Sequence, residues 1–260
     1  MKQEVITRNS TSPSKSVELV FVHGAYHGAW CWDEYYLPWF AENNWSCHGI
    51  SLRGHEADAP KDGDINCSLE DYVNDVCEFV NTLEKPVILV GHSMGGVIIQ
   101  RCFEKNDRVV GMIPFASSPL KPSFGVLLKI IFLHPLDFFR GQVLGDTDSL
   151  KRAMASFFFD KNLDESLRER YMSMLTAESS KAIGSVFNRT YPTVKFDEKR
   201  PILVVGGRED WSIPLRDHHA LADYYGAPLS ICSGSHDLML DPQWKDSAEE
   251  ILTWLNSKFC

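Results

Sequence analysis

The sequence predicts a doubly wound α/β domain built around a mostly parallel sheet. Short apolar runs alternate with helical patterns along the chain, and four of these runs stand out: 17–22, 87–90, 109–116 and 202–205. Each run is continuously apolar, as is typical of parallel strands that are covered on both faces. Proline and glycine residues flank the second and fourth runs, which favours strands over fragments of buried helix.

The clearest helical pattern lies at 68–83, just before the second run. Ser68 can cap its N-terminus, and Asp71, three residues later, can complete a capping box. Its apolar stripe consists of Leu69, Val73, Val76, Val80 and Leu83. Such a stripe must pack on a sheet, and right-handed crossovers then place ligands beyond the carboxyl ends of the strands. We therefore expect functional residues in the loops that follow strands.

One segment, at about 117–190, interrupts the alternation of strands and helices. Helical patterns dominate it, and seven phenylalanines accumulate there: Phe124, Phe132, Phe138, Phe139, Phe157, Phe158 and Phe159. We interpret this segment as a helical cap inserted over the strand ends of a single domain of 260 residues, whose core is formed by 1–116 and 191–260. The alternative is that these aromatic residues belong to ordinary helices packed on the main core.

Composition narrows the class of protein. Hydrophobic residues make up 44% and charged residues 23%, which is ordinary for a globular protein and excludes disordered and coiled-coil classes. The net charge of −9 and the lack of Lys/Arg runs argue against a nucleic-acid partner, because phosphates are bound by clustered cations. Seven cysteines without a Cys-x-x-Cys pair predict reduced thiols. The chain has neither a signal-like apolar stretch nor the roughly 20 apolar residues of a spanning helix, so we expect a cytoplasmic protein without an integral membrane segment.

The sharpest catalytic signal is the segment GHSMGG at 91–96, which directly follows the second apolar run and precedes a helical pattern. In a G-x-S-x-G turn the serine has a strained backbone that tolerates only small residues two positions away, and Gly91 and Gly95 supply them. Ser93 is therefore the candidate nucleophile, and the backbone N–H of Met94 is a candidate donor to an oxyanion. A glycine-rich turn with an incidental serine is the alternative, which the strand, turn and helix context disfavours.

A serine hydroxyl is a poor nucleophile unless a base removes its proton, so a histidine is expected close to it in space. His236 follows the last strand candidate, at about 228–231, in the loop where the base of the chain order serine, acid, histidine emerges. His92 adjoins Ser93 and should point away from it, and His23 is interpreted as a structural residue. His236 is thus the candidate base.

The acid that orients the imidazole is expected between the serine and the histidine, at another strand end. The segment GGREDWSIP at 206–214 offers Asp210 and its neighbour Glu209, and residue chemistry alone does not separate the two. A second oxyanion donor is expected in the loop after the first run, which begins HGAYHGAWCW. The backbone N–H of Ala25 is the candidate.

Together, the segments HGAYHGAWCW, GHSMGG, GREDWSIP and GSHDLMLDP resemble the α/β-hydrolase superfamily. The first of them in particular resembles the plant methylesterase and hydroxynitrile lyase branch. The resemblance extends from about residue 17 to the C-terminus and is weakest in the cap. It implies an α/β-hydrolase fold, a small-molecule ester substrate, and neither a cofactor nor a metal ion. The site residues that it implies are Ser93, Asp210 and His236 as a catalytic triad, with Ala25 and Met94 as oxyanion donors.

Two residues depart from the hydroxynitrile lyases of that branch. Ala25 stands where those enzymes have threonine, and Asp237 stands where a lysine follows their catalytic histidine, which argues against cyanohydrin cleavage. We therefore expect a serine hydrolase that cleaves a carboxylic ester of a small, apolar substrate through an acyl-enzyme. The alternatives are a cofactor-free lyase or a thioesterase on the same triad, or a ligand receptor with slow turnover, because fold and triad do not fix the reaction. The sequence identifies neither the substrate nor the oligomeric state.

Overall fold

A seven-stranded sheet lies at the centre of the computed structural model, which describes residues 3–11, 15–118, 136, 149, 157–187 and 199–260. Its strand order is β1-β3-β2-β4-β5-β6-β7. The strands are β1 (Val5–Arg8), β2 (Glu18–Val22), β3 (Cys47–Ile50), β4 (Val87–His92), β5 (Val109–Phe115), β6 (Val204–Gly207) and β7 (Leu229–Cys232). Only the pair of β1 and β3 is antiparallel, so the predicted mostly parallel sheet is confirmed.

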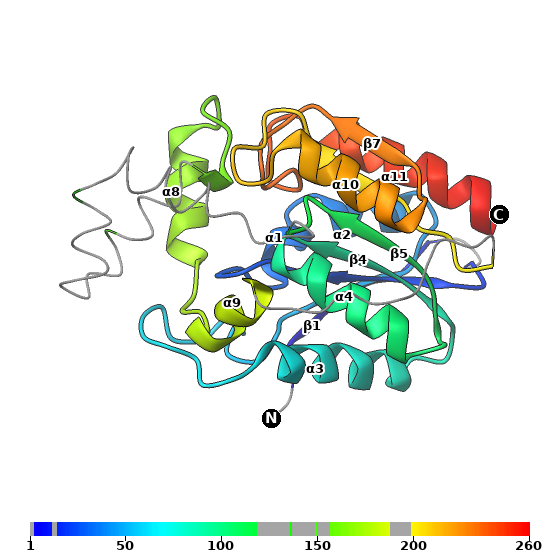
Figure 1. The fold of residues 1–260 in the computed structure, drawn as a ribbon, viewed down its shortest axis with the longest axis horizontal. Helices are drawn as coiled ribbons and strands as arrows, with labels where there is room; N and C mark the ends of the chain where they lie inside the picture. The colour runs from blue at the N-terminus through cyan, green and yellow to red at the C-terminus, as the bar shows by residue number, and fades with distance from the viewer. Residues whose placement is uncertain (1–2, 12–14, 119–135, 137–148, 150–156, 188–198) are drawn as a thin grey trace.

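Helices cover both faces of this sheet (Figure 1). Successive side chains of a strand point to opposite faces, so Leu19 and Phe21 of β2 pack in one apolar cluster and Val20 and Val22 in the other. Among the helices of the first cluster are α1 (Trp30–Asp33), α2 (Tyr36–Glu42) and α11 (Trp244–Phe259). Among those of the second are α3 (Leu69–Thr82), α4 (Met94–Lys105) and α10 (Leu215–Tyr225). Burial on both faces explains why the strand sequences are continuously apolar.

The predicted capping box of α3 is present. The Ser68 hydroxyl accepts the N–H of Asp71 at 3.2 Å, and the Asp71 carboxylate accepts the N–H of Ser68 at 2.7 Å.

The predicted boundaries of β6 are wrong by two residues. Ile202 forms only an isolated bridge with Met112, and the strand extends instead to Gly207.

The sequence pattern does not predict β1 or β3. β1 lies at the edge of the sheet, where β3 is its only partner among the strands that the structure describes, and its side chains are half-buried or exposed. β3 has the sequence CHGI, in which Gly49 is a weak strand former. A Cβ at Gly49 would lie only 3.0 Å from the Leu37 Cδ1 atom of α2. Close approach of a helix therefore explains a glycine that weakens the sequence signal.

Between β5 and β6 the chain forms α8 (Glu165–Met174) and α9 (Ser180–Phe187), which confirms a helical insertion. In Figure 1, α8 lies on the left, at one end of the sheet. Among the seven phenylalanines, those at 157–159 are buried, and Phe124, Phe132, Phe138 and Phe139 lie outside the described residues. The cap boundaries of about 117–190, and with them the division of the domain, stay a prediction. None of the helices described here is both long enough and apolar enough to span a membrane.

Candidate active site

Ser93 occupies the turn between β4 and α4 with φ 50° and ψ −113°, a conformation that is strained for a residue with a side chain. A Cβ at Gly95 would lie 2.4 Å from the His23 carbonyl oxygen, and a Cβ at Gly91 would lie 2.5 Å from the Gly95 carbonyl oxygen. The glycine spacing is thus a steric requirement of the turn. The N–H of Ser93 donates to the Phe115 carbonyl at 3.1 Å, which ties the turn to β5.

The imidazole of His236 lies between Ser93 and Asp210. Its Nε2 atom is 3.0 Å from the Ser93 Oγ atom, and its Nδ1 atom is 2.8 Å from the Asp210 Oδ2 atom. With a proton on Nδ1, the ring donates to Asp210 and accepts from the Ser93 hydroxyl. The three side chains come from the loops after β4, β6 and β7. The structure therefore brings together the serine, acid and histidine that the sequence singles out.

Asp210 and Glu209 have different surroundings. The Asp210 carboxylate is fully buried, and its Oδ1 atom accepts the N–H groups of Ser212 at 2.7 Å and Ile213 at 2.8 Å. Glu209 lies at the surface, and its carboxylate accepts the N–H of Gly234 at 2.8 Å. Of these two carboxylates, only that of Asp210 contacts the imidazole of His236.

The charge around His236 favours its protonated form. Burial by itself lowers the pKa of His236, but the charge of Asp210, the hydrogen bond that the imidazole donates to Asp210 and the charge of Asp237 outweigh burial and raise that pKa above its ordinary value. An imidazole with a raised pKa is a stronger base. This arrangement supports removal of a proton from Ser93.

The loop after β2 passes directly beside Ser93. A Cβ at Gly24 would lie 3.0 Å from the Ser93 Cβ atom and 2.7 Å from the His92 Nδ1 atom. Ala25 follows Gly24. Neither the Ala25 N–H nor the Met94 N–H donates a hydrogen bond to any residue that the structure describes. An oxyanion is stabilised by backbone N–H donors of this kind next to a nucleophile.

His23 has a structural role in this loop, as expected. Its Nδ1 atom lies 2.7 Å from the Gly24 carbonyl oxygen, and its Nε2 atom accepts the N–H of Leu52 at 3.0 Å. Burial, with a smaller contribution from His55, holds the pKa of His23 well below its ordinary value. A neutral His23 therefore connects the loop to the neighbouring strand end.

A second buried carboxylate lies next to His236, and the sequence gives it no role. The Asp237 Oδ2 atom is 3.0 Å from the His27 Nε2 atom, and its Oδ1 atom is 3.4 Å from the His92 Nε2 atom. The His27 Nδ1 atom in turn lies 2.8 Å from the Ala25 carbonyl oxygen. Asp237 thus links the histidine loop to the candidate oxyanion loop through His27.

Burial determines the charge of His92, and the neighbouring histidines determine that of Asp237. Burial lowers the pKa of His92 to about 3, although Asp237 opposes that shift. Burial raises the pKa of Asp237, but His27 and the other two histidines outweigh burial and lower it. Asp237 therefore stays ionised and His92 neutral near pH 7.

Ligand atoms of His92, His236 and Asp237 lie within 4.8 Å of one another, a spacing at which a metal ion can bind. Both ring nitrogens of His236 are already engaged by Ser93 and Asp210. Binding of a metal ion to His236 would therefore break the contacts of the candidate base. The residues fit a proton-transfer site better than a metal site.

The insertion contributes Phe158 to this region. Its ring stacks on the imidazole of His236, with centroids 6.3 Å apart and planes inclined by 21°. Its carbonyl oxygen accepts the N–H of Asp237 at 3.0 Å and the hydroxyl of Ser235 at 3.2 Å. The sequence predicts only that Phe158 belongs to an aromatic segment, and its contact with the histidine loop depends on the fold.

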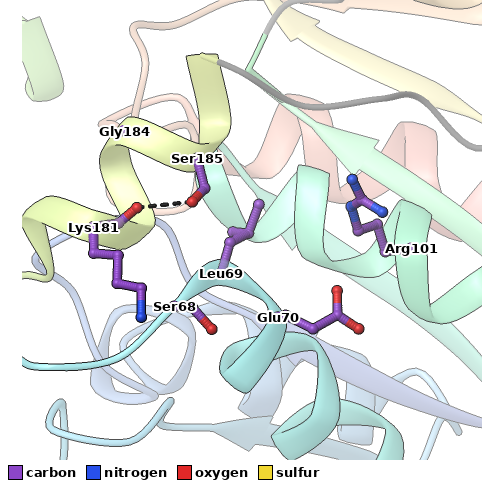
Figure 2. A pocket seen from close by; sticks show the side chains of 7 residues that line it. All are labelled: Ser68, Leu69, Glu70, Arg101, Lys181, Gly184 and Ser185. Atoms are coloured by element: carbon purple, nitrogen blue, oxygen red, sulfur yellow. Dashed lines mark hydrogen bonds between the residues drawn. The ribbon is translucent and has the colours of Figure 1, made fainter.

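A separate surface pocket of about 390 Å³ lies between α9, the start of α3 and α4 (Figure 2). It shares no residue with the candidate active site. Figure 2 shows acidic and basic side chains from the three helices around it. Its lining residues are Ser68, Leu69, Glu70, Arg101, Lys181, Gly184 and Ser185.

Comparison with known proteins agrees with the fold and with the motifs. A segment of 119 residues is 32% identical to methyl jasmonate esterase 1 of Vitis vinifera and covers 44% of each chain. A segment of 79 residues is 41% identical to methylesterase 18 of Arabidopsis thaliana and covers 30% of this chain and 29% of the relative. The chain thus spans less than half the length of these curated relatives. They confirm the resemblance to plant methylesterases.

The solved structure of an esterase from Exiguobacterium antarcticum has the same fold. It superposes with a TM-score of 0.74 at 18% identity, over 98% of this chain and 95% of that chain. The model of the family described as "Alpha/beta hydrolase family" matches residues 19–246, from β2 into α11. The chain therefore belongs to the alpha/beta hydrolase family.

Proposed function

We propose that this protein is a serine hydrolase that cleaves a carboxylic ester of a small molecule through an acyl-enzyme. The observation that carries the proposal is the continuous chain of contacts from Asp210 through His236 to Ser93, at 2.8 Å and 3.0 Å. Ser93 is the nucleophile, His236 the general base and Asp210 the group that orients and stabilises the imidazole.

Each step of the reaction uses a group in this site. The Ser93 Oγ atom attacks the ester carbonyl while the His236 Nε2 atom takes the hydroxyl proton. The N–H groups of Ala25 and Met94 stabilise the negative oxygen of the tetrahedral intermediate. His236 then returns the proton to the leaving alkoxide, and a water molecule, activated by the same imidazole, releases the acid and regenerates Ser93.

Three observations support a small and partly apolar ester as the substrate. Two of the matching plant relatives, methyl jasmonate esterase 1 and methylesterase 18, are named for the hydrolysis of methyl esters. The aromatic ring of Phe158 stacks on His236 and makes that side of the site apolar. Asp237 adds a negative charge next to His236, where the hydroxynitrile lyases have lysine, and this favours ester hydrolysis over cyanohydrin cleavage.

Substitution of the nucleophile tests this function. In Ser93→Ala, kcat for short p-nitrophenyl esters should fall by at least about 1,000-fold, because the acyl-enzyme can no longer form. Ser257→Ala is the matched control, since Ser257 is an exposed residue of α11 and its loss should leave turnover unchanged. A folded Ser93→Ala protein with turnover close to that of the wild type would refute the proposal.

A further inference from the structure

Two thiols outside the candidate active site are in direct contact. Cys77 on α3 and Cys102 on α4 place their Sγ atoms 2.7 Å apart. Figure 1 shows the two helices running side by side along the sheet. A disulfide bond needs a sulfur separation of about 2.05 Å and side chains directed at each other. The two sulfur atoms already meet, so bond formation needs an approach of less than about 1 Å.

The two cysteines differ in exposure and in the ease of deprotonation. Cys102 is fully buried, whereas Cys77 is only half-buried. The contact with Cys102 lowers the pKa of the Cys77 thiol, burial opposes that shift, and the positive charge of Lys105 adds to it while Glu70 and Glu78 reduce it. The same contact, together with burial, raises the pKa of Cys102. Of the two thiols, Cys77 therefore loses its proton more readily, and Cys102 keeps its proton.

The other five cysteines have different surroundings. Those that are buried are Cys31, Cys47, Cys67 and Cys232, and Cys260 is exposed at the C-terminus. Cys77 and Cys102 are the only sulfur pair in hydrogen-bond contact within the described part of the chain. Reaction at this pair is thus expected to be selective, with Cys260 as the competing exposed thiol.

We propose that Cys77 and Cys102 form a dithiol site that a small disulfide, such as oxidised glutathione, converts reversibly into a disulfide bond between α3 and α4. The Cys77 thiolate attacks one sulfur of the oxidant and releases the first small thiolate, which leaves a mixed disulfide on Cys77. Cys102 gives up its proton and attacks the Cys77 sulfur, which releases the second small thiolate. Two electrons pass from the cysteine pair to the oxidant, and two small thiols are formed.

The bond would enclose the nucleophile turn. Cys77 and Cys102 are 25 positions apart, and Ser93 lies between them. A disulfide restricts the unfolded chain, and for a loop of this length the melting temperature should rise by roughly 5 °C or more. The disulfide is therefore expected to stabilise the folded chain, including the turn that holds Ser93.

Peptide mapping of the full chain tests the proposal. The wild type, Cys77→Ser and Cys102→Ser are incubated with oxidised glutathione, free thiols are alkylated, and the peptides are identified by mass spectrometry without reduction. We expect a Cys77–Cys102 linked peptide in the wild type that disappears on reduction. Cys102→Ser should keep one glutathione on Cys77, because the second attack is blocked, and Cys77→Ser should form neither product.

Two results would contradict the proposed dithiol site or its effect on stability. A folded wild-type protein that takes up glutathione only at Cys260, with Cys77 and Cys102 both alkylated, would overturn the proposal. A linked peptide without a reversible rise in melting temperature would contradict the stabilising effect. Cys260→Ser serves as the matched control, since it removes the exposed competitor and should leave the linked peptide unchanged.

Discussion

Asp210 and Glu209 are neighbouring carboxylates in the loop after β6, and their side chains differ by one methylene group. Residue chemistry does not separate the two, and the resemblance to the α/β-hydrolase superfamily favours Asp210. The structure adds a physical reason, because Asp210 is held by two backbone N–H groups and contacts His236, whereas Glu209 binds the backbone of Gly234. The distinction can be tested by neutralising each carboxylate in turn.

Asp210→Asn should lower kcat on the order of 10⁴-fold, because an amide cannot stabilise the imidazolium and favours the wrong tautomer. Glu209→Gln keeps an oxygen acceptor for Gly234 and should stay within a few-fold of the wild type. Steady-state kinetics with a p-nitrophenyl ester measures both. Comparable losses in the two variants would show that Asp210 has no special role.

The raised pKa of His236 predicts the acidic limb of the pH profile. His236 must be neutral to accept the Ser93 proton, so kcat/KM should fall as the pH drops through the pKa of His236, which lies above 6.5. Asp237 contributes to that raised value. Asp237→Asn should therefore move the midpoint of the limb to lower pH.

The matched control for this shift is Asp223→Asn, which changes an exposed carboxylate of α10. Its pH profile should coincide with that of the wild type. A limb that stays in place in Asp237→Asn, or moves to higher pH, would contradict the electrostatic role of Asp237.

At the scale of elements, the segment between α8 and α9 holds the candidate oxyanion loop in place. Tyr26 has a positive φ of 67°, and its carbonyl accepts the N–H of Thr176 at 2.9 Å. The buried Glu178 carboxylate accepts the N–H of Tyr26 at 3.1 Å and the hydroxyl of Tyr72 at 2.8 Å, and it lies 3.1 Å from the His55 Nε2 atom. One carboxylate thus joins the insertion, α3 and the loop that carries Ala25.

Glu178→Gln should lower the free energy of unfolding by about 1–3 kcal/mol, because its amide NH₂ would face groups that donate hydrogen bonds. It should also lower kcat, since Tyr26 adjoins Ala25. Glu165→Gln in α8 is the matched control; this side chain is 76% exposed, and its change should stay within about 0.5 kcal/mol. Denaturant unfolding and ester kinetics measure both. A Glu178→Gln protein as stable and active as the control would refute this role.

Elements with local signals could be predicted from sequence, and contacts between distant segments could not. The capping box of α3 involves residues three positions apart, and the run at 87–90 in β4 is apolar enough to be predicted alone. Asp237 and Glu178 look like ordinary acidic residues in the sequence. Their partners His27 and Tyr26 lie far away along the chain, so their roles depend on the fold.

At the scale of the whole molecule, the parallel sheet explains why residues from three distant segments meet. The carboxyl ends of β4, β6 and β7 lie at the same edge of the sheet, so the loops that follow them deliver Ser93, Asp210 and His236 to one place. The chain order of strands and motifs predicts Ser93 and His236 at this edge, and the resemblance to the family supplies the choice of Asp210 over Glu209. The edge strand β1 and the contacts of Phe158 required the complete fold, because weak local patterns give no sign of them.

The central claim is that Ser93 is a nucleophile activated by His236, and covalent labelling tests it most directly. A fluorophosphonate reacts with an activated serine hydroxyl and leaves a stable adduct. We predict one adduct per folded chain, mapped by mass spectrometry to the peptide that contains Ser93, and none in His236→Ala or after unfolding. A folded wild-type protein that remains unlabelled at Ser93, or is labelled at another residue instead, would contradict the account.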